Sequence, residues 1–183
     1  MLQAFPALAM TTNSVNATAL DTAAVQGHVD IVNLLLETDA SLARIARNNG
    51  KTVLHSAARM GHVEVVRSLL NKDPDIGLRT DKKGQTALHM ASKGQNADIV
   101  VELLKPDISV VHVEDKQGNR PLHVATRKGN IIVGDHILKC LFFFTFIQLY
   151  NFYIICIQSF TRRTYFIRIV LSIKLNTFWL SEF

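Results

Sequence analysis

The sequence predicts an all-α solenoid, in which paired antiparallel helices with hairpin loops stack one after another and a hydrophobic C-terminal tail follows. The main observation is an internal repeat, because four segments align without a gap and begin 34 residues apart. Self-similarity at such a period is the sequence signature of repeat architectures. The four copies begin at Thr18, Thr52, Thr86 and Arg120, and each has a leucine two residues later.

Each copy carries signals for two short helices and a loop. A threonine hydroxyl stands at the N-cap position of the first helix in three copies, and a glycine follows that helix, where a positive φ closes the turn. Valines and leucines follow one face of the second helix, as in residues 62–70, and a further glycine marks each hairpin tip. We assign the structural repeat motif to Thr52, His55, Thr86, His89, His123, Gly27 and Gly61.

The repeat divides the chain into unequal units. Asp21 replaces the motif histidine in the first full unit, and in the third Gly94 comes one position early, so that Gln95 occupies the turn. Gly134 falls inside the second helix of the last unit, where it costs about 1 kcal/mol relative to alanine, and we expect the pattern to break there. The units are residues 2–17 (the second half of an incomplete repeat), 18–51, 52–85, 86–119 and 120–138 (a partial repeat), followed by the tail 139–183.

The recurring core of Thr or Arg, any residue, Leu-His, any residue and Ala, with a following Gly-His, resembles ankyrin repeats. More narrowly, the segments DKKGQTALHMASKG and NGKTVLHSAARMGHVEVV resemble plant ankyrin-repeat proteins that end in a multi-span membrane domain. The resemblance implies a role in protein–protein interaction and signalling, on the cytoplasmic side of the plasma membrane. Without a membrane anchor in the tail, the expected location is the cytoplasm. The membrane domain of that family carries a Pro-Gly-Gly signature, and the tail 139–183 contains neither residue.

No residue pattern predicts an enzyme, a metal site, a cofactor or a small-molecule substrate. His55, His89 and His123 recur with the repeat, so they lie roughly 8–10 Å apart along the stack, too far to share one zinc ion, whose ligands lie within about 2.3 Å. We expect each imidazole instead to form hydrogen bonds near a helix N-terminus and to connect adjacent repeats. Ser56 lacks the surroundings of a catalytic serine, and no glycine-rich phosphate loop is present.

Basic and polar residues gather at the hairpin tips and at the ends of the first helices. In ankyrin arrays these regions line the concave face, so the resemblance places partner contacts there, and the positive charge suggests an acidic protein segment. A solvated surface without a partner is the alternative. Nucleic acid is not expected, because no aromatic residues interleave with the charges. The predicted partner-binding residues are Lys51, Lys82, Lys83, Gln85, Lys93 and Arg127.

The tail differs in composition from the repeats. Residues 140–183 contain 13 of the 14 aromatic residues and no Ala, Gly or Pro. Residues 140–161 are free of charge over 22 positions, and about 20 are needed to span a membrane. The amino acids that dominate the tail are also those encoded by T-rich non-coding DNA, so read-through past the end of an exon is a second interpretation. A third is a buried cap on the array.

Overall fold

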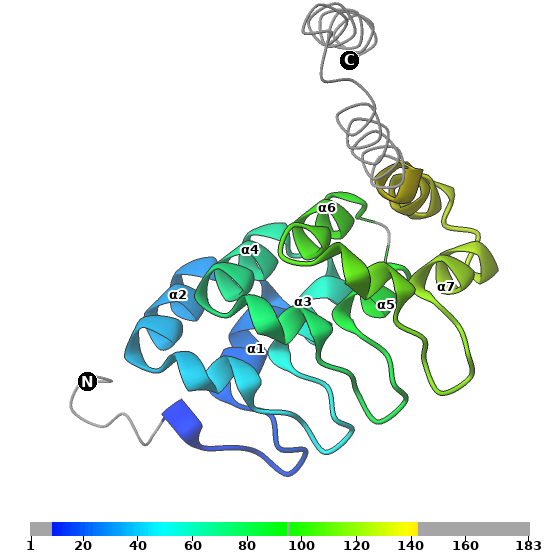
Figure 1. The fold of residues 1–183 in the computed structure, drawn as a ribbon. Coiled ribbons are helices and arrows are strands. Elements are labelled where there is room, and N and C mark those ends of the chain that lie inside the picture. The colour runs from blue at the N-terminus through cyan, green and yellow to red at the C-terminus, as the bar shows by residue number, and fades with distance from the viewer. Residues whose placement is uncertain (1–8, 95, 143–183) are drawn as a thin grey trace, which may run out of the picture. The chain divides into compact units, whose positions relative to one another are not determined.

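The computed structural model describes residues 9–94 and 96–142, and these residues form helix pairs stacked side by side (Figure 1). The first helices of the pairs are α1 (Ala19–Gln26), α3 (Val53–Met60), α5 (Ala87–Ala91) and α7 (Pro121–Arg127). The second helices are α2 (Val29–Thr38), α4 (Val63–Lys72) and α6 (Asp98–Leu104), and residues 131–142 are helical as well. Short 3-10 helices follow the second helices: η2 (Ala40–Arg44), η3 (Pro74–Leu78) and η4 (Ile108–His112).

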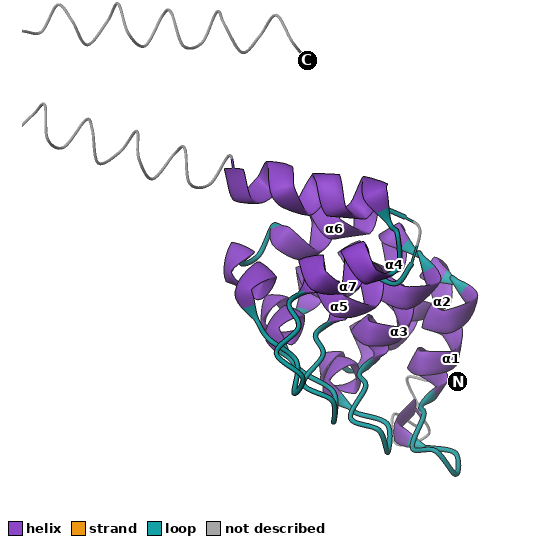
Figure 2. Ribbon diagram, turned by 90° about the vertical axis from the view of Figure 1, so that its right-hand side faces the viewer, coloured by secondary structure: helices purple, strands orange, loops and turns teal. Residues whose placement is uncertain are grey.

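The first helices form one layer and the second helices the other, and the connecting loops project together from one edge (Figure 2). The expected β-hairpins are hairpin-shaped loops rather than paired strands. Within the described ranges only isolated bridges occur, between Thr12 and Thr18 and between Ala46 and Thr52.

The core is aliphatic, and it runs continuously through successive repeats. Leu20, Leu54 and Leu88 occupy equivalent positions in successive first helices, and all three are fully buried. No Phe, Tyr or Trp occurs between residues 19 and 138. Each pair of helices therefore depends on its neighbours to cover its apolar surface, as in other solenoids.

The first-helix boundaries follow the sequence signals. Thr18 caps α1 by accepting a hydrogen bond from the backbone N–H of Asp21 at 3.2 Å, and Gly27 ends that helix with φ of 78°. A side chain at this glycine would also collide with its neighbour, because an added Cβ would lie 2.8 Å from the imidazole of His62. Gly27 is therefore needed both for its left-handed backbone and for the close approach of the next repeat.

The third turn and the fourth repeat differ from the regular pattern. Since Gly94 comes one position early, α5 spans only five residues, and Asn96 bridges to the previous repeat by donating to the Gly61 carbonyl at 3.2 Å. The expected break at Gly134 does not occur: its N–H donates to the Asn130 carbonyl at 3.0 Å, and the helix continues to residue 142. Burial of Val133 and Ile137 outweighs the low helix propensity of one glycine.

The predictions for the tail lie largely outside the described residues. Among residues 9–94 and 96–142, no helix is both long and apolar enough to cross a membrane. The proposed span 140–161 and the remainder of 139–183 fall almost wholly beyond residue 142, as residues 2–8 of the incomplete first unit fall before residue 9.

Candidate interaction surface

Aspartates close the loops at the ends of the second and third full repeats. The carboxylate of Asp81 accepts hydrogen bonds from the backbone N–H groups of Lys83 at 2.8 Å and Gln85 at 3.0 Å. Asp115 does the same for Gln117 and Asn119, at 3.0 and 2.9 Å. Short aspartate side chains that bond to the backbone two residues onward are typical of tight turns. Sequence analysis missed these residues, although their signal is visible in the repeated Asp-Lys-x-Gly pattern.

Backbone hydrogen bonds join each loop to the next. The N–H of Asn48 donates to the Val15 carbonyl at 3.1 Å, Lys82 donates to Asn49 at 3.0 Å, and Lys116 donates to Lys83 at 2.9 Å. Each donor lies 34 positions after the previous one, so the loops form a ladder that follows the repeat. The side chains at the tips are therefore held at regular intervals along one edge of the array.

Two motif histidines, one in α3 and one in α5, each connect their helix to the following loop. Nε2 of His55 lies 2.9 Å from the carbonyl oxygen of Gln85, and Nε2 of His89 lies 3.0 Å from that of Asn119. A carbonyl can only accept, so Nε2 carries the proton and the unprotonated Nδ1 accepts from the backbone N–H of the N-cap threonine. This second bond measures 3.2 Å from Thr52 to His55 and 3.1 Å from Thr86 to His89.

Burial lowers the pKa of both histidines. The loss of solvation outweighs the opposing effects of the carbonyl hydrogen bond and of nearby aspartates, so the neutral ring is favoured in the fold. His123 occupies the same position in the fourth repeat but is exposed, and its Nδ1 accepts from the N–H of Arg120 at 3.1 Å. The histidines therefore act in packing and helix capping. Among the described residues, no group of His, Cys, Asp and Glu is arranged to hold a metal ion.

An ion pair takes the place of the histidine in the first full repeat. The guanidinium of Arg47 donates to both carboxylate oxygens of Asp21 at 3.0 Å, and the Ser56 hydroxyl lies 3.3 Å from the same carboxylate. Asp21 is buried, whereas Arg47 is partly exposed. Arg47 also stands where the next two loops have Asp81 and Asp115. The connection from the first helix to the following loop is thus retained with different chemistry, and Arg47 is not a free cation at the loop tip.

Gln85, one of the predicted partner-binding residues, is engaged within the array. Its side-chain amide is buried, with Nε2 donating to Asp115 at 2.8 Å and Oε1 accepting from the Lys93 ammonium at 2.5 Å. Burial opposes ionisation of Asp115, but the hydrogen bonds from Gln85, Asn119 and Gln117 outweigh it and hold the pKa of this carboxyl well below its usual range. Both ends of the Gln85 amide therefore stabilise the array.

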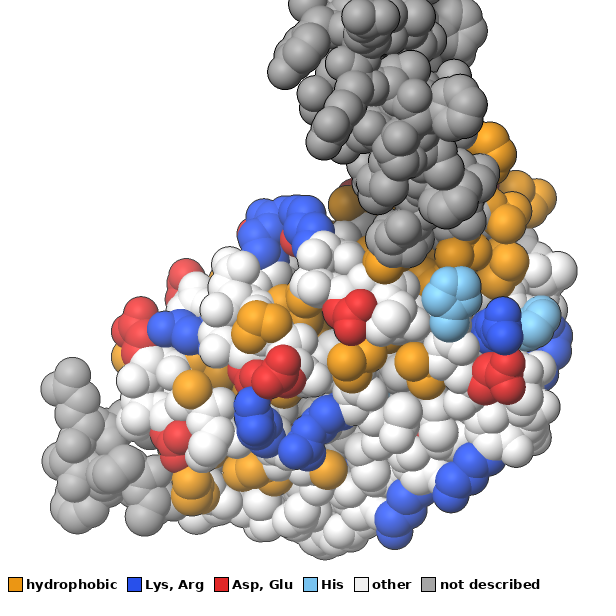
Figure 3. Space-filling view, viewed as in Figure 1, with side chains coloured by type: hydrophobic (Ala, Val, Ile, Leu, Met, Phe, Trp, Pro, Cys, Tyr) orange, Lys and Arg blue, Asp and Glu red, His pale blue; other side chains and the backbone are white. Residues whose placement is uncertain are grey.

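The remaining predicted cations lie on loops and first-helix ends. Lys82, Lys83 and Arg127 are exposed, while Lys51 and Lys93 are half-buried. Burial lowers the pKa of Lys93, and the positive charges of Lys51, Arg59 and Lys83 lower it further, which shows that these cations share one region. The lower edge in Figure 3, where the loops of Figure 1 end, carries basic side chains with no acidic ones beside them.

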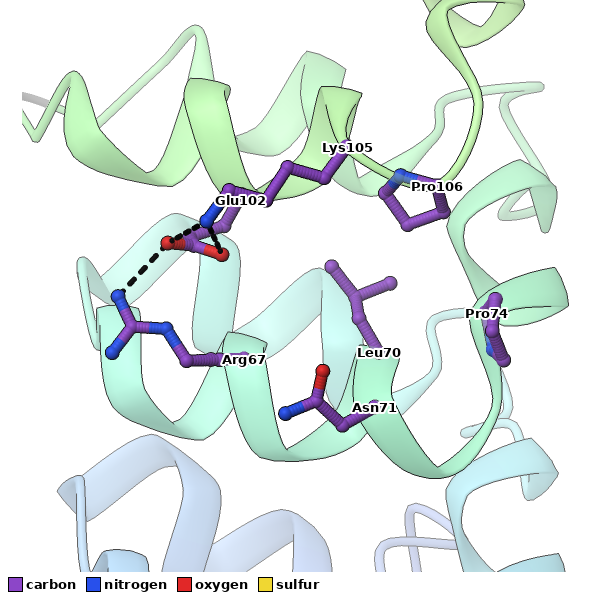
Figure 4. Close-up of a pocket in the computed structure, with 7 residues that line it drawn as sticks. All are labelled: Arg67, Leu70, Asn71, Pro74, Glu102, Lys105 and Pro106. Atoms are coloured by element: carbon purple, nitrogen blue, oxygen red, sulfur yellow. Dashed lines mark hydrogen bonds and ion pairs between the residues drawn. The ribbon is translucent and has the colours of Figure 1, made fainter.

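Two hollows in the described part of the array lie away from the loop tips. One, of about 430 Å³, is formed by the turns of the second and third repeats, with Arg59, Met60 and Asp98 among its walls. The other, of about 440 Å³, lies between α4 and α6, with Leu70, Pro74 and Pro106 in its wall (Figure 4).

The cations beside the second hollow are paired with a carboxylate of the array. The carboxylate of Glu102 accepts from Arg67 and from Lys105, each at 2.8 Å (Figure 4). The hydrogen bonds from Arg67 and Lys105 hold the pKa of Glu102 below its usual value, against the effect of its burial. Both cations of this hollow are thus engaged within the array, unlike Lys82 and Lys83 at the loop edge.

The comparison with known families agrees with this architecture. A family model described as ankyrin repeats (3 copies) matches residues 3–80 and 72–141. No curated protein matches the sequence. The match covers most of the chain and all of the helix pairs described above, so this chain belongs to the ankyrin-repeat family.

Proposed function

We propose that this chain is a non-enzymatic module that binds a segment of another protein along its concave face, defined here as the loop tips and the ends of the first helices. Ankyrin repeats generally bind protein partners. The observation that supports this face is the ladder of backbone hydrogen bonds between loops, which holds the tips in place before a partner arrives. A surface ordered in advance loses less conformational entropy on binding.

The charge of this face favours an acidic partner segment. Lys82, Lys83 and Arg127 are exposed, and none of them forms a salt bridge with another residue in the described ranges. Burial is the main cause of the lowered pKa of Lys93, and the charge of Lys51 lowers it further, so both cations add to the positive charge of this region. Complementary charge increases the association rate and helps to select the partner.

Charge reversal tests this proposal. Lys83→Glu and the double variant Lys82→Glu/Lys83→Glu should recover less of an acidic partner in affinity capture, and the loss should diminish at high salt because screening weakens the attraction. Lys72→Glu is the matched control, since Lys72 is an exposed cation at the end of α4, away from the loops. Equal recovery with Lys83→Glu and Lys72→Glu would argue against the concave face.

Membrane attachment is a second proposal, and it rests on the 22 uncharged residues 140–161. In this alternative the chain is a signalling protein held on the cytoplasmic side of the plasma membrane by its tail, with the repeats facing the cytoplasm. Alkaline extraction of membranes tests it, because an integral segment stays in the pellet. Release into the supernatant would overturn the proposal and leave a cytoplasmic location.

A further inference from the structure

The junctions between successive repeats bury the same positions each time. We call the side of a repeat that meets the preceding repeat its leading face, and the side that meets the following repeat its trailing face. On the leading face, equivalent places in successive second helices are occupied by Val65, Ile99 and Val133, and all three are fully buried. On the trailing face, the equivalent residues are Leu36, Leu70 and Leu104, and they are almost fully buried. Each internal junction therefore joins one leading face to one trailing face, with the same kinds of apolar side chain.

At the two ends of the described array these positions are uncovered. Ile31, the leading-face equivalent of Val65, has 48% of its surface exposed. Leu138, the trailing-face equivalent of Leu104, has 52% exposed. Hydrophobic side chains also gather beside α7 and the helical residues 131–142 in Figure 3. One end thus presents a leading face and the other a trailing face, and neither has its counterpart among residues 9–94 and 96–142.

The hydrogen-bonding groups of a junction are repeated at the ends as well. At the internal junctions, Nε2 of His55 and His89 donates to the carbonyl of the loop residue that directly precedes the N-cap of the next first helix. His123 is the exposed third member of this series. The carbonyl of Ala17 is equivalent to that of Gln85, and in its own loop it accepts only the N–H of Asn13, at 3.1 Å, among the described residues. A donor on the trailing face and an acceptor on the leading face are therefore placed as in the internal junctions.

We propose that copies of this chain associate head to tail, with the leading face of one copy, at α1 and α2, packed on the trailing face of another, at α7 and residues 131–142. Ile31 then lies against the Leu138 region of the neighbouring copy, and His123 donates to the Ala17 carbonyl across the junction. The partner is a second copy of the chain, because its leading face matches the internal ones in residue type and hydrogen-bond register. Such a contact joins two different surfaces, so a dimer keeps one leading and one trailing face available and longer chains of copies can form. Repeat arrays normally prevent this with polar terminal repeats.

Complementary end variants test the proposal in the full-length chain. Ile31→Glu places a charge on the leading face, and Leu138→Glu places one on the trailing face. Val101→Glu is the matched control, since Val101 lies on α6 away from both faces and is 40% exposed. Mass would be measured by analytical ultracentrifugation over a concentration series, with helix content followed by circular dichroism.

The expected masses differ for each sample. Wild type and Val101→Glu should form dimers and longer species as the concentration rises, while Ile31→Glu and Leu138→Glu should each remain single chains. An equal mixture of the two end variants should form dimers and nothing larger, because only one intact leading face and one intact trailing face can meet. Recovery of association in the mixture also shows that both variants are folded. A single-chain mass for wild type at every concentration would overturn the proposal, as would end variants that assemble like wild type or a mixture that stays monomeric.

Discussion

Acidification from pH 7.5 to 5.5 is expected to destabilise the array through His55 and His89. Both rings are neutral in the fold, and a proton on Nδ1 would face the backbone N–H of Thr52 or Thr86, which donates to that nitrogen at 3.2 or 3.1 Å. Burial lowers the pKa of each histidine below the unfolded value, which is about 6.5. The unfolded chain therefore binds protons first. Stability is fully present above about pH 6.5 and is lost as the pH falls towards the folded pKa.

The size of this effect has an upper limit set by linkage. One histidine that stays neutral in the fold costs at most about 1.4 kcal/mol by pH 5.5, and two cost at most about 2.7 kcal/mol. Asp73, Glu102 and Asp115 have lowered pKa values, so their contributions are lost only below their unfolded pKa values of about 4, outside this window. The two effects are therefore separable by pH.

Urea unfolding at a series of pH values measures the prediction. The free energy of unfolding of wild type should fall between pH 7.5 and 5.5, and His55→Gln or His89→Gln should each remove about half of the slope. His112→Gln is the control, because His112 is exposed at the end of η4. A flat wild-type profile, or histidine variants with the wild-type slope, would refute the assignment of neutral imidazoles to these junctions.

Two further predictions concern stability. Gly134→Ala should raise the free energy of unfolding by about 1 kcal/mol, since an added Cβ would meet only Leu122 Cδ1 at 3.9 Å. Gly27→Ala should lower the free energy of unfolding because of the φ of 78° and the nearby His62. Thermal unfolding that ranks the two variants the other way would contradict the helix through Gly134. Asp21→Ala should lower the free energy of unfolding by about 3 kcal/mol, because it leaves Arg47 without its buried partner. Adding Arg47→Ala to that variant should lower the free energy of unfolding little further. A double-mutant cycle with no coupling between the two residues would show that the ion pair contributes nothing.

The sequence was sufficient for the helix pairs because their signals are local. Thr18 and Gly27 mark the two ends of α1 through groups within a few residues of each, and the same pattern recurs at the 34-residue period. The hydrogen bonds of His55 and His89 were expected because these residues recur with the motif, whereas the other side-chain contacts between residues about 30 positions apart were harder to predict. Gln85 has the sequence position of a surface residue at a loop tip, but its amide is bound by Asp115 of the next loop and by Lys93.

Two other features depended on tertiary packing. Arg47 belongs to a basic cluster in the sequence, but its charge is balanced by Asp21, which stands where a histidine was expected. Gly134 is an unfavourable residue for a helix, yet the helix passes through it because Val133 and Ile137 are buried on either side. Pairing with a buried carboxylate decided the outcome for Arg47 and burial of neighbouring side chains decided it for Gly134, and neither effect is visible in the residue itself.

Site-specific photo-crosslinking tests the central claim, that the concave face binds an acidic protein segment. A photoreactive amino acid would replace Lys83 at a loop tip or, in a separate sample, Lys72 on the outer helix α4, and the crosslinked partner peptide would be identified by mass spectrometry. The account predicts crosslinks from position 83, to a peptide rich in Asp and Glu, and none to that peptide from position 72. Crosslinks from position 72 alone, or from position 83 to a peptide without acidic residues, would contradict it.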